Sequence, residues 1–302
     1  MEIEDQVADR RRNIIGTIIK VVGGIYTVLT SEKEMVECSI RTTAKKTRLV
    51  VGDRVEIVPN EFSAGKYIIT KCLERSCYIP RPPIANLEKL LIVIAPRPEP
   101  DLLLVDKLII YCYLNNIEPI IVINKSDISP KGFIEDISSQ YYFLNRFVIS
   151  AKNSEGIEDI EKYINGSFVA VCGQSAVGKS SFINALIPGF DLQTQGLSNK
   201  IDRGKHTTRV NEIYLHKDYM IADTTGFSSL ELELEHKELP LYYPEFEPYL
   251  DGCKYLNCAH IKEGKDCVII SAVADGKINK SRYDRYKDLY EYLRKKWENK
   301  YD

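Results

Sequence analysis

The sequence predicts a multidomain protein: a small N-terminal β-barrel, a central α/β domain, and a C-terminal domain of helices around a knuckle rich in cysteine and histidine. Three observations lead to this organisation. Short β-rich segments fill residues 1–75, apolar strands alternate with helical segments over 76–231, and cysteine and histidine residues cluster within 232–302. A chain of 302 residues is also too long for one typical core.

The first domain is expected to be a barrel because short β-rich segments follow one another with glycine turns, as at Gly23-Gly24. The expected strands are 14–22, 25–29, 36–40, 54–58 and 66–70. Five short strands in about sixty residues are typical of an OB or SH3-like barrel. Segment 41–48 has four basic residues and no acid, which suits either a phosphate-contacting patch or a solvated loop.

The central domain is expected to contain a parallel sheet with helices on both faces. Its strands are apolar along their length, and helical patterns such as 101–115 lie between them. The expected strands are one within 86–96, then 119–124, 147–150, 168–172 and 219–222. Strands that are apolar on both faces need cover on both sides, which parallel strands with crossover helices provide.

A glycine-rich loop directly follows the strand at 168–172 and precedes a helical stretch, 181–186. It fits G-x-x-x-x-G-K-[ST] in the context that this phosphate-binding motif requires. Its glycines let backbone N–H groups wrap a phosphate chain. Lys179 would pair with the β- and γ-phosphates as a candidate catalytic residue, and Ser180 would coordinate Mg²⁺. The loop consists of Gly173, Gln174, Ser175, Ala176, Val177, Gly178, Lys179, Ser180 and Ser181.

The nucleotide base is predicted from a second motif at the carboxyl end of an apolar strand, where ligands of open α/β sheets bind. This motif is Asn124-Lys125-Ser126-Asp127. The Asp127 carboxylate can accept hydrogen bonds from guanine N1–H and the 2-amino group, which adenine lacks. Asn124 would brace the loop, and the Lys125 stem would lie over the base. Ser150-Ala151-Lys152, at another strand end, would form the second base-contacting loop.

Two further segments complete the expected GTPase site. Asp223-Thr224-Thr225-Gly226 fits D-x-x-G after a strand, so Asp223 would hold Mg²⁺ through water and the Gly226 N–H would sense the γ-phosphate. The loop 189–209 should supply a threonine as another Mg²⁺ ligand, and Thr208 is favoured over Thr207. The base-reading motifs precede the phosphate loop, the reverse of Ras-like GTPases, so the chain is circularly permuted.

The residue that positions the attacking water is not obvious from these motifs. Phe227 stands where Ras-like enzymes place a water-orienting glutamine, so slow intrinsic hydrolysis is expected. His206, in the loop beside Thr207 and Thr208, is the candidate replacement. The other interpretation is an exposed loop histidine with no part in the reaction.

The C-terminal domain contains a candidate zinc site. Cys253, Cys258, His260 and Cys267 offer three thiolates and one imidazole within fifteen residues, which makes a closed tetrahedral set for one structural Zn²⁺. The alternative is one disulfide and a free thiol, which a reducing compartment disfavours. The remaining five cysteines are scattered among mostly apolar neighbours and are expected to be buried thiols.

These features together resemble the RsgA (YjeQ) family of ribosome small-subunit-dependent GTPases, over nearly the whole chain. The segments 204–208, 243–246, 272–276 and 281–283 are also similar to that family. The resemblance implies an OB-fold, binding to the small ribosomal subunit and its rRNA, GTP hydrolysis stimulated by the subunit, and a role in late subunit maturation. Thr225 departs from the proline that is usual in the family, and altered loop stiffness is the expected effect.

Alternatives from two other classes remain at this stage. One is an RNA-binding assembly factor that holds the nucleotide with negligible turnover, and the other is a P-loop ATPase or kinase in which Asp127 is incidental. The net charge of −2 gives no long-range attraction to nucleic acid, so RNA contacts must come from local patches. No signal peptide or membrane span is seen in the sequence, and a cytoplasmic monomer is expected.

Overall fold

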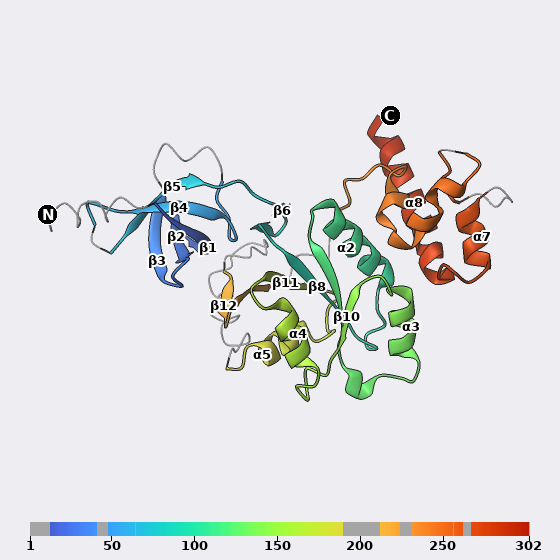
Figure 1. Ribbon diagram of the computed structural model, residues 1–302, viewed down its shortest axis with the longest axis horizontal. Helices are drawn as coiled ribbons and strands as arrows, with labels where there is room; N and C mark the ends of the chain where they lie inside the picture. The colour runs from blue at the N-terminus through green and yellow to red at the C-terminus, as the bar shows by residue number, and fades with distance from the viewer. Residues whose placement is uncertain are drawn as a thin grey trace.

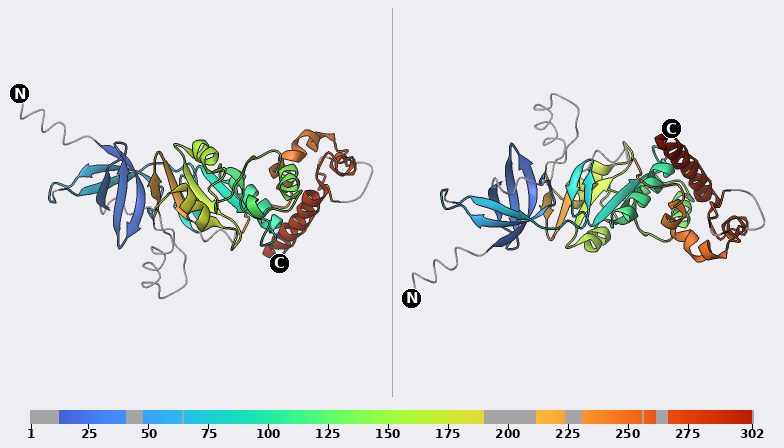
Figure 2. Two further views of the ribbon diagram at one scale, coloured as in Figure 1. Left: turned by 90° about the horizontal axis from the view of Figure 1, so that it is seen from below. Right: turned by 90° about the horizontal axis from the view of Figure 1, so that it is seen from above.

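The predicted parts follow one another along an elongated molecule. The computed structural model has the barrel at one end, the α/β domain in the middle and the C-terminal helices at the far end (Figure 1), and the perpendicular views agree (Figure 2). The structure describes residues 13–40, 48–63, 65–189, 212–223, 231–255, 257–261 and 267–301.

The N-terminal domain is a closed five-stranded barrel, and all five expected strands are confirmed. They are β1 (Ile14–Val22), β2 (Ile25–Thr30), β3 (Met35–Ile40), β4 (Arg54–Pro59) and β5 (Tyr67–Cys72). The order β1-β2-β3-β5-β4 closes where β1 pairs with β4, and β3 runs parallel to β5. Ile18, Val28, Ile57 and Ile69 are fully buried at its centre. Of the basic segment, residues 41–47 lie outside the described residues.

A short hairpin that sequence reasoning missed joins the barrel to the sheet. It consists of β6 (Tyr78–Pro80) and β7 (Pro83–Ala85). The Ala85 N–H donates to the Val51 carbonyl at 3.0 Å, beside Gly52 with φ of +86°. A side chain at Gly52 would be impossible without a shift, because its Cβ would lie 2.0 Å from the Ala85 oxygen. This close approach fixes the hairpin against the barrel.

The central domain contains a six-stranded sheet in the order β10-β9-β8-β11-β13-β12. Every neighbouring pair is parallel except β12 with β13. The strands are β8 (Lys89–Ile94), β9 (Glu118–Ile123), β10 (Asn145–Val148), β11 (Phe168–Cys172), β12 (Tyr214–His216) and β13 (Tyr219–Asp223). This architecture confirms the predicted parallel sheet, with β12 as an antiparallel edge strand.

Helices cover both faces of this sheet, which explains strands that are apolar on both sides. Leu90 and Ile92 of β8 pack with α2 on one face, whereas Leu91 and Val93 pack with α4 and α5 on the other. The helices are α2 (Leu102–Leu114), α3 (Phe133–Gln140), α4 (Ile157–Ile164) and α5 (Lys179–Leu186). Consecutive strand residues point to opposite faces, so each strand contributes to both cores.

The C-terminal module packs against the face that bears α2. It consists of η4 (Leu239–Tyr242), η5 (Pro244–Gly252), α7 (Val268–Ala274) and α8 (Lys280–Tyr301). Along one face α8 buries Tyr283, Tyr286, Leu289, Tyr290 and Leu293. Trp297 continues the same helical spacing but is 36% exposed. Among the described residues, none of the helices has the length and apolar character to cross a membrane.

Candidate nucleotide-binding site and Cys/His cluster

The glycine-rich loop leaves β11 at the carboxyl edge of the sheet and enters α5. Gly173 and Gly178 both have positive φ, +135° and +95°. A Cβ on Gly173 would lie 2.2 Å from the Val93 carbonyl oxygen, and one on Gly178 would lie 2.5 Å from Asn124 Nδ2. Only glycine fits these positions, and α5 then presents its first-turn N–H groups to the loop, as phosphate binding requires.

Lys179 lies back over this loop. Its Nζ donates to the Gly173 carbonyl at 3.0 Å and to the Gln174 carbonyl at 2.7 Å. These bonds hold the ammonium group against the backbone of the glycine-rich loop. Ser180 and Ser181 follow in the first turn of α5.

Asn124 joins three loops of the site through one buried side chain, which is 2% exposed. Its Nδ2 donates to the Val177 carbonyl of the phosphate loop at 3.0 Å. Its Oδ1 accepts from the Lys125 N–H at 2.8 Å and from the Ala151 N–H at 3.1 Å. A single amide thereby fixes the spacing between the phosphate loop and the two loops predicted to read the base.

The residues predicted to contact the base lie around this amide. Lys125, at φ +62°, donates from Nζ to the Ala176 carbonyl at 2.8 Å, so its stem crosses toward the phosphate loop. Asp127 accepts from the Ser150 hydroxyl at 2.8 Å. The Ser126 N–H donates to the Ile149 carbonyl at 3.1 Å, which joins this loop to the strand end before Ser150-Ala151-Lys152. A carboxylate oriented in this way is suited to a purine that offers two adjacent donors.

Several predicted site residues lie outside the described part of the chain. His206, Thr208 and Gly226 belong to this group, and so does Thr225, the departure from the family's usual proline. Asp223 is described through its backbone, which pairs in register with Val171 of β11. The backbone of Asp223 is therefore at the same sheet edge as the phosphate loop.

The loop between β8 and α2 is a part of this region that sequence reasoning missed. The Arg97 carbonyl accepts from Lys125 Nζ at 2.8 Å, and the Asp101 N–H donates to Gln174 Oε1 at 3.1 Å. Both ends of this loop thus contact residues of the predicted site. The available signal was the proline-rich run at 96–100, directly after an apolar strand of an open sheet.

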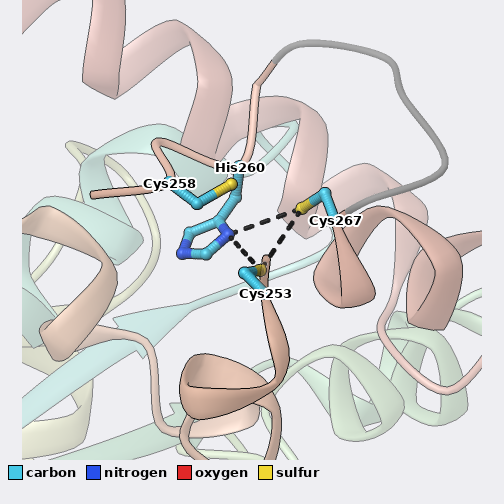
Figure 3. Close-up of side chains that lie close together, drawn as sticks. All are labelled: Cys253, Cys258, His260 and Cys267. Atoms are coloured by element: carbon cyan, nitrogen blue, oxygen red, sulfur yellow. Dashed lines mark hydrogen bonds between the residues drawn. The ribbon is translucent and has the colours of Figure 1, made fainter. Parts of the chain in front are cut away.

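The four predicted zinc ligands lie together in the C-terminal module (Figure 3), with all their donor atoms within 4.8 Å of one another. The Sγ atoms of Cys253 and Cys267 are 3.9 Å apart, and each lies 3.5 Å from His260 Nδ1. Tetrahedral Zn²⁺, with bonds of about 2.3 Å to sulfur and 2.0–2.1 Å to nitrogen, requires about 3.8 Å and 3.6 Å. Cys258 is the fourth member of the cluster.

Without a cation, burial disfavours the charged forms of the side chains in this cluster. It raises the pKa of the Cys267 thiol to about 12 and lowers the pKa of His260. A divalent cation would reverse the thiol shift by stabilising thiolates, and it binds neutral imidazole. The donor set, its spacing and its burial therefore fit a zinc ion.

A phosphate loop, a base-reading loop and a permuted strand order together define a circularly permuted GTPase. Family models assign the same class: RsgA GTPase matches residues 72–233, and RsgA N-terminal domain matches 15–67. A third model, 50S ribosome-binding GTPase, matches 168–300 and so begins at β11, the strand with which an unpermuted GTPase starts. The chain belongs to the RsgA family.

Relatives cover almost the full chain. Small ribosomal subunit biogenesis GTPase RsgA of Geobacillus thermodenitrificans is 39% identical over 280 residues, 90% of this chain and 94% of the relative. The protein of the same name from Clostridium botulinum strain Loch Maree is 36% identical, over 93% of this chain and 99% of the relative. The crystal structure of YjeQ from Thermotoga maritima superposes with a TM-score of 0.81 at 29% identity, over 93% of this chain and 99% of that one. The crystal structure of YloQ, described as a circularly permuted GTPase, superposes with a TM-score of 0.79 at 25% identity, over 95% of this chain and 97% of that one.

Proposed function

We propose that the protein is a GTPase that acts in the late maturation of the small ribosomal subunit and hydrolyses GTP to GDP and phosphate. The observation that carries the GTPase part is the bonding of Asn124, because its amide links the phosphate loop to both loops predicted to read guanine. The biogenesis role rests on curated relatives that are named for it.

In this proposal each loop has one task. Asp127 accepts from guanine, with its carboxylate oriented by Ser150, and the Lys125 stem covers the base. Lys179 leaves its two carbonyl partners to bind the β- and γ-phosphates. The N–H groups that open α5 bind the same phosphates, and the Gly226 N–H reports the γ-phosphate. The remaining phosphate-loop and base-loop positions support these contacts through their backbone.

Magnesium is assigned to the side chains of Ser180, Thr208 and Asp223. When bound, Mg²⁺ neutralises charge on the β- and γ-phosphate oxygens. Ser180 lies in the first turn of α5 and the Asp223 backbone is in register with β11, which supports a shared position at one sheet edge. His206 is proposed to orient the attacking water, because Phe227 cannot donate or accept a hydrogen bond there.

The Cys/His cluster is proposed to hold one structural zinc ion, with Cys253, Cys258, His260 and Cys267 as its four ligands. Four protein ligands leave no open coordination position, so the ion would stabilise the C-terminal module rather than take part in hydrolysis. Tyr283 and Tyr286 of α8 donate from their hydroxyls to the carbonyls of His260 and Ala259, at 2.6 and 2.7 Å, which connects the knuckle to that helix.

The proposed partner is the small ribosomal subunit with its rRNA. The barrel, residues 1–75, and the zinc module, 232–302, flank the GTPase domain, 76–231, and either can contact RNA. A cytoplasmic, monomeric protein is part of the same proposal, and the subunit is proposed to raise the hydrolysis rate.

The deciding experiment is hydrolysis by the purified protein with and without small subunits, with ATP as the control nucleotide. Slow GTP turnover that small subunits accelerate, with no ATP turnover, supports the proposal. GTP turnover that subunits leave unchanged favours the alternative, a nucleotide-holding assembly factor with negligible turnover. His206→Ala should lower the stimulated rate, and an unchanged stimulated rate would show that another group positions the water.

A further inference from the structure

A groove on the C-terminal module lies between two segments that are far apart in the sequence. One is the stretch 231–238, which precedes η4, and the other is the last part of α8, which runs to the end marked C in Figure 1. Lys296 of α8 joins them, because its Nζ lies 3.2 Å from Glu231 Oε2 and donates to the Leu232 carbonyl at 3.4 Å. The groove has a volume of about 490 Å³, which is in the range of ligand sites.

The inner surface of this groove is apolar. Leu232 and Leu293 line it and are 2% and 1% exposed, so they close its base. Leu234 is half-buried and Trp297 is 36% exposed, so both leave apolar surface open to an occupant. The Trp297 ring packs edge-on against buried His236, with ring centres 5.7 Å apart. A tryptophan held in this way beside a leucine is a suitable contact for an apolar side chain of a partner.

The rim of the groove is acidic. Of the lining residues only Lys296 is basic, and it is paired with Glu231. Among the ion pairs of the described residues, none involves the other three acids of the rim. The four acidic side chains are exposed, and they are Glu231, Glu233, Glu235 and Glu238. The lining therefore carries three uncompensated negative charges around an apolar surface.

This charge selects the class of occupant. A phosphate backbone is repelled by three free carboxylates, so the groove disfavours RNA. A second copy of this chain, with a net charge of −2, has no general attraction to it. Lysine and arginine side chains complement the rim, and Trp297 accepts a cation, because Lys237 Nζ lies 5.9 Å from the centre of its ring. The apolar base adds a requirement for apolar side chains between the cations.

We propose that this groove binds a basic segment of a partner protein, in which lysines or arginines alternate with apolar residues. Segments with blocks of positive charge are typical of the arms with which proteins bind nucleic acid. The carboxylates of the rim pair with the cations, and Leu234 and Trp297 contact the apolar side chains. The inference goes beyond the proposed function and does not depend on it, since no residue of the groove belongs to the nucleotide site.

The test uses the full-length protein and the blocked peptide KLKKLK as the probe. Trp297 is the single tryptophan of the chain, so the peptide should give a saturable blue shift of protein fluorescence that weakens with added salt. Dye-labelled peptide, followed by anisotropy, gives the affinity independently of Trp297. Glu233→Gln and Glu235→Gln should each weaken binding by about two- to fivefold, and together by about tenfold. Glu247→Gln, an exposed acid of η5 outside the groove, should leave the affinity unchanged.

The comparison probes separate this proposal from simpler ones. The peptide KGKKGK and spermidine should bind more weakly than KLKKLK, and Leu234→Ala should remove that advantage of KLKKLK. The peptide ELEELE and poly(U) RNA should not shift the tryptophan fluorescence.

The proposal is overturned if neither readout shows saturable binding of KLKKLK up to about 1 mM. It is also overturned if spermidine binds as well, which would indicate a general polycation surface, or if poly(U) competes for the groove. An unchanged affinity in the Glu233 and Glu235 double variant would have the same meaning. GTP turnover of that variant should stay within about twofold of the unchanged protein, so a failure here is distinct from a failure of the proposed function.

Discussion

Removal of the buried Arg282 guanidinium is expected to destabilise the C-terminal module more than removal of any exposed charge on α8. The Arg282 side chain is 1% exposed. Its Nη1 donates to Asp106 of α2 at 2.5 Å, and its Nε donates to Glu245. Its Cζ lies 4.8–5.0 Å from the ring centres of Tyr141, Phe143 and Tyr243. One side chain thus joins the module to the α/β domain.

The loss of stability in Arg282→Met depends on which hydrogen-bond donors remain for Asp106 and Glu245. Asp106 retains Arg285, whose Nε donates to it at 2.6 Å. Glu245 loses its charged donor, and removal of one partner of a buried pair costs about 3–5 kcal/mol. Burial already raises the pKa of Glu245, so uptake of a proton can limit the loss and the lower end, about 3 kcal/mol, is expected.

The assay uses the single tryptophan of the chain, Trp297, which lies on α8 and reports unfolding of this module. With a urea dependence of about 1–3 kcal/mol per molar, the midpoint for Arg282→Met should fall by about 1–3 M. Arg294→Met is the control, since Arg294 is 43% exposed on the same helix and pairs with the exposed acids Glu291 and Glu298. If the urea midpoints of Arg282→Met and Arg294→Met lie within about 0.5 M of each other, the reasoning is refuted.

Three further results are expected. Asp127→Asn should weaken GDP binding by about 10²- to 10⁴-fold, because an NH₂ donor replaces one of the two carboxylate oxygens that would accept from guanine, and xanthosine diphosphate should then bind better than GDP in calorimetry. Cys267→Ala should lower bound zinc from one atom per chain toward none in elemental analysis. Burial raises the pKa of Glu118, but hydrogen bonds from Lys89, Tyr163 and Asn145 outweigh it and the pKa is lowered. Glu118→Gln should therefore lower the free energy of unfolding above about pH 4.3. The difference in stability from the unchanged protein should vanish as the pH falls through the pKa that Glu118 has in the folded state.

Each of these has a control on the same chain. ADP binding should be unaffected in Asp127→Asn, and retained GDP affinity would show that the carboxylate does not read the base. Cys72→Ser, in the barrel, should keep its zinc, and loss there would point to unfolding rather than ligation. For Glu118→Gln the control is the same pair of proteins at low pH, where Glu118 is protonated in the folded and unfolded states and the difference in stability should be absent. A Glu118 effect that is constant with pH would exclude the proposed linkage.

The elements that the sequence predicts well are those whose signal is local. The barrel strands and β8, β9 and β11 follow from short apolar or alternating runs, and the phosphate loop follows from glycines that no other residue can replace. The hairpin of β6 and β7 escaped because its strands have three residues each and contain prolines. Trp297 fits the helical period of α8, yet it is 36% exposed, so the period alone does not tell which positions the rest of the module covers.

The contacts between domains could not be predicted, because their partners are far apart in sequence. Arg282 pairs with Asp106 across 176 positions and with Glu245 across 37. A charged residue within a helix normally marks its solvent face, and nothing local indicates that this one is enclosed by three aromatic rings. The ion pair of Lys20 and Glu212, between the barrel and the α/β domain, spans 192 positions. Both contacts depend on how finished domains pack, which motif spacing does not encode.

Because the chain is circularly permuted, both flanking domains are joined to strands next to the phosphate loop. The chain enters the sheet at β8 and leaves it after β13, and these are the two neighbours of β11, the strand that carries the phosphate loop. In addition, α2 contacts that loop through Asp101 and Gln174 and holds Arg282 through Asp106, about a turn and a half further along. Each flanking domain is therefore joined to a strand that pairs directly with β11. In the unpermuted order, the chain would instead leave the sheet after β10, at the far edge, and the C-terminal domain would follow that strand.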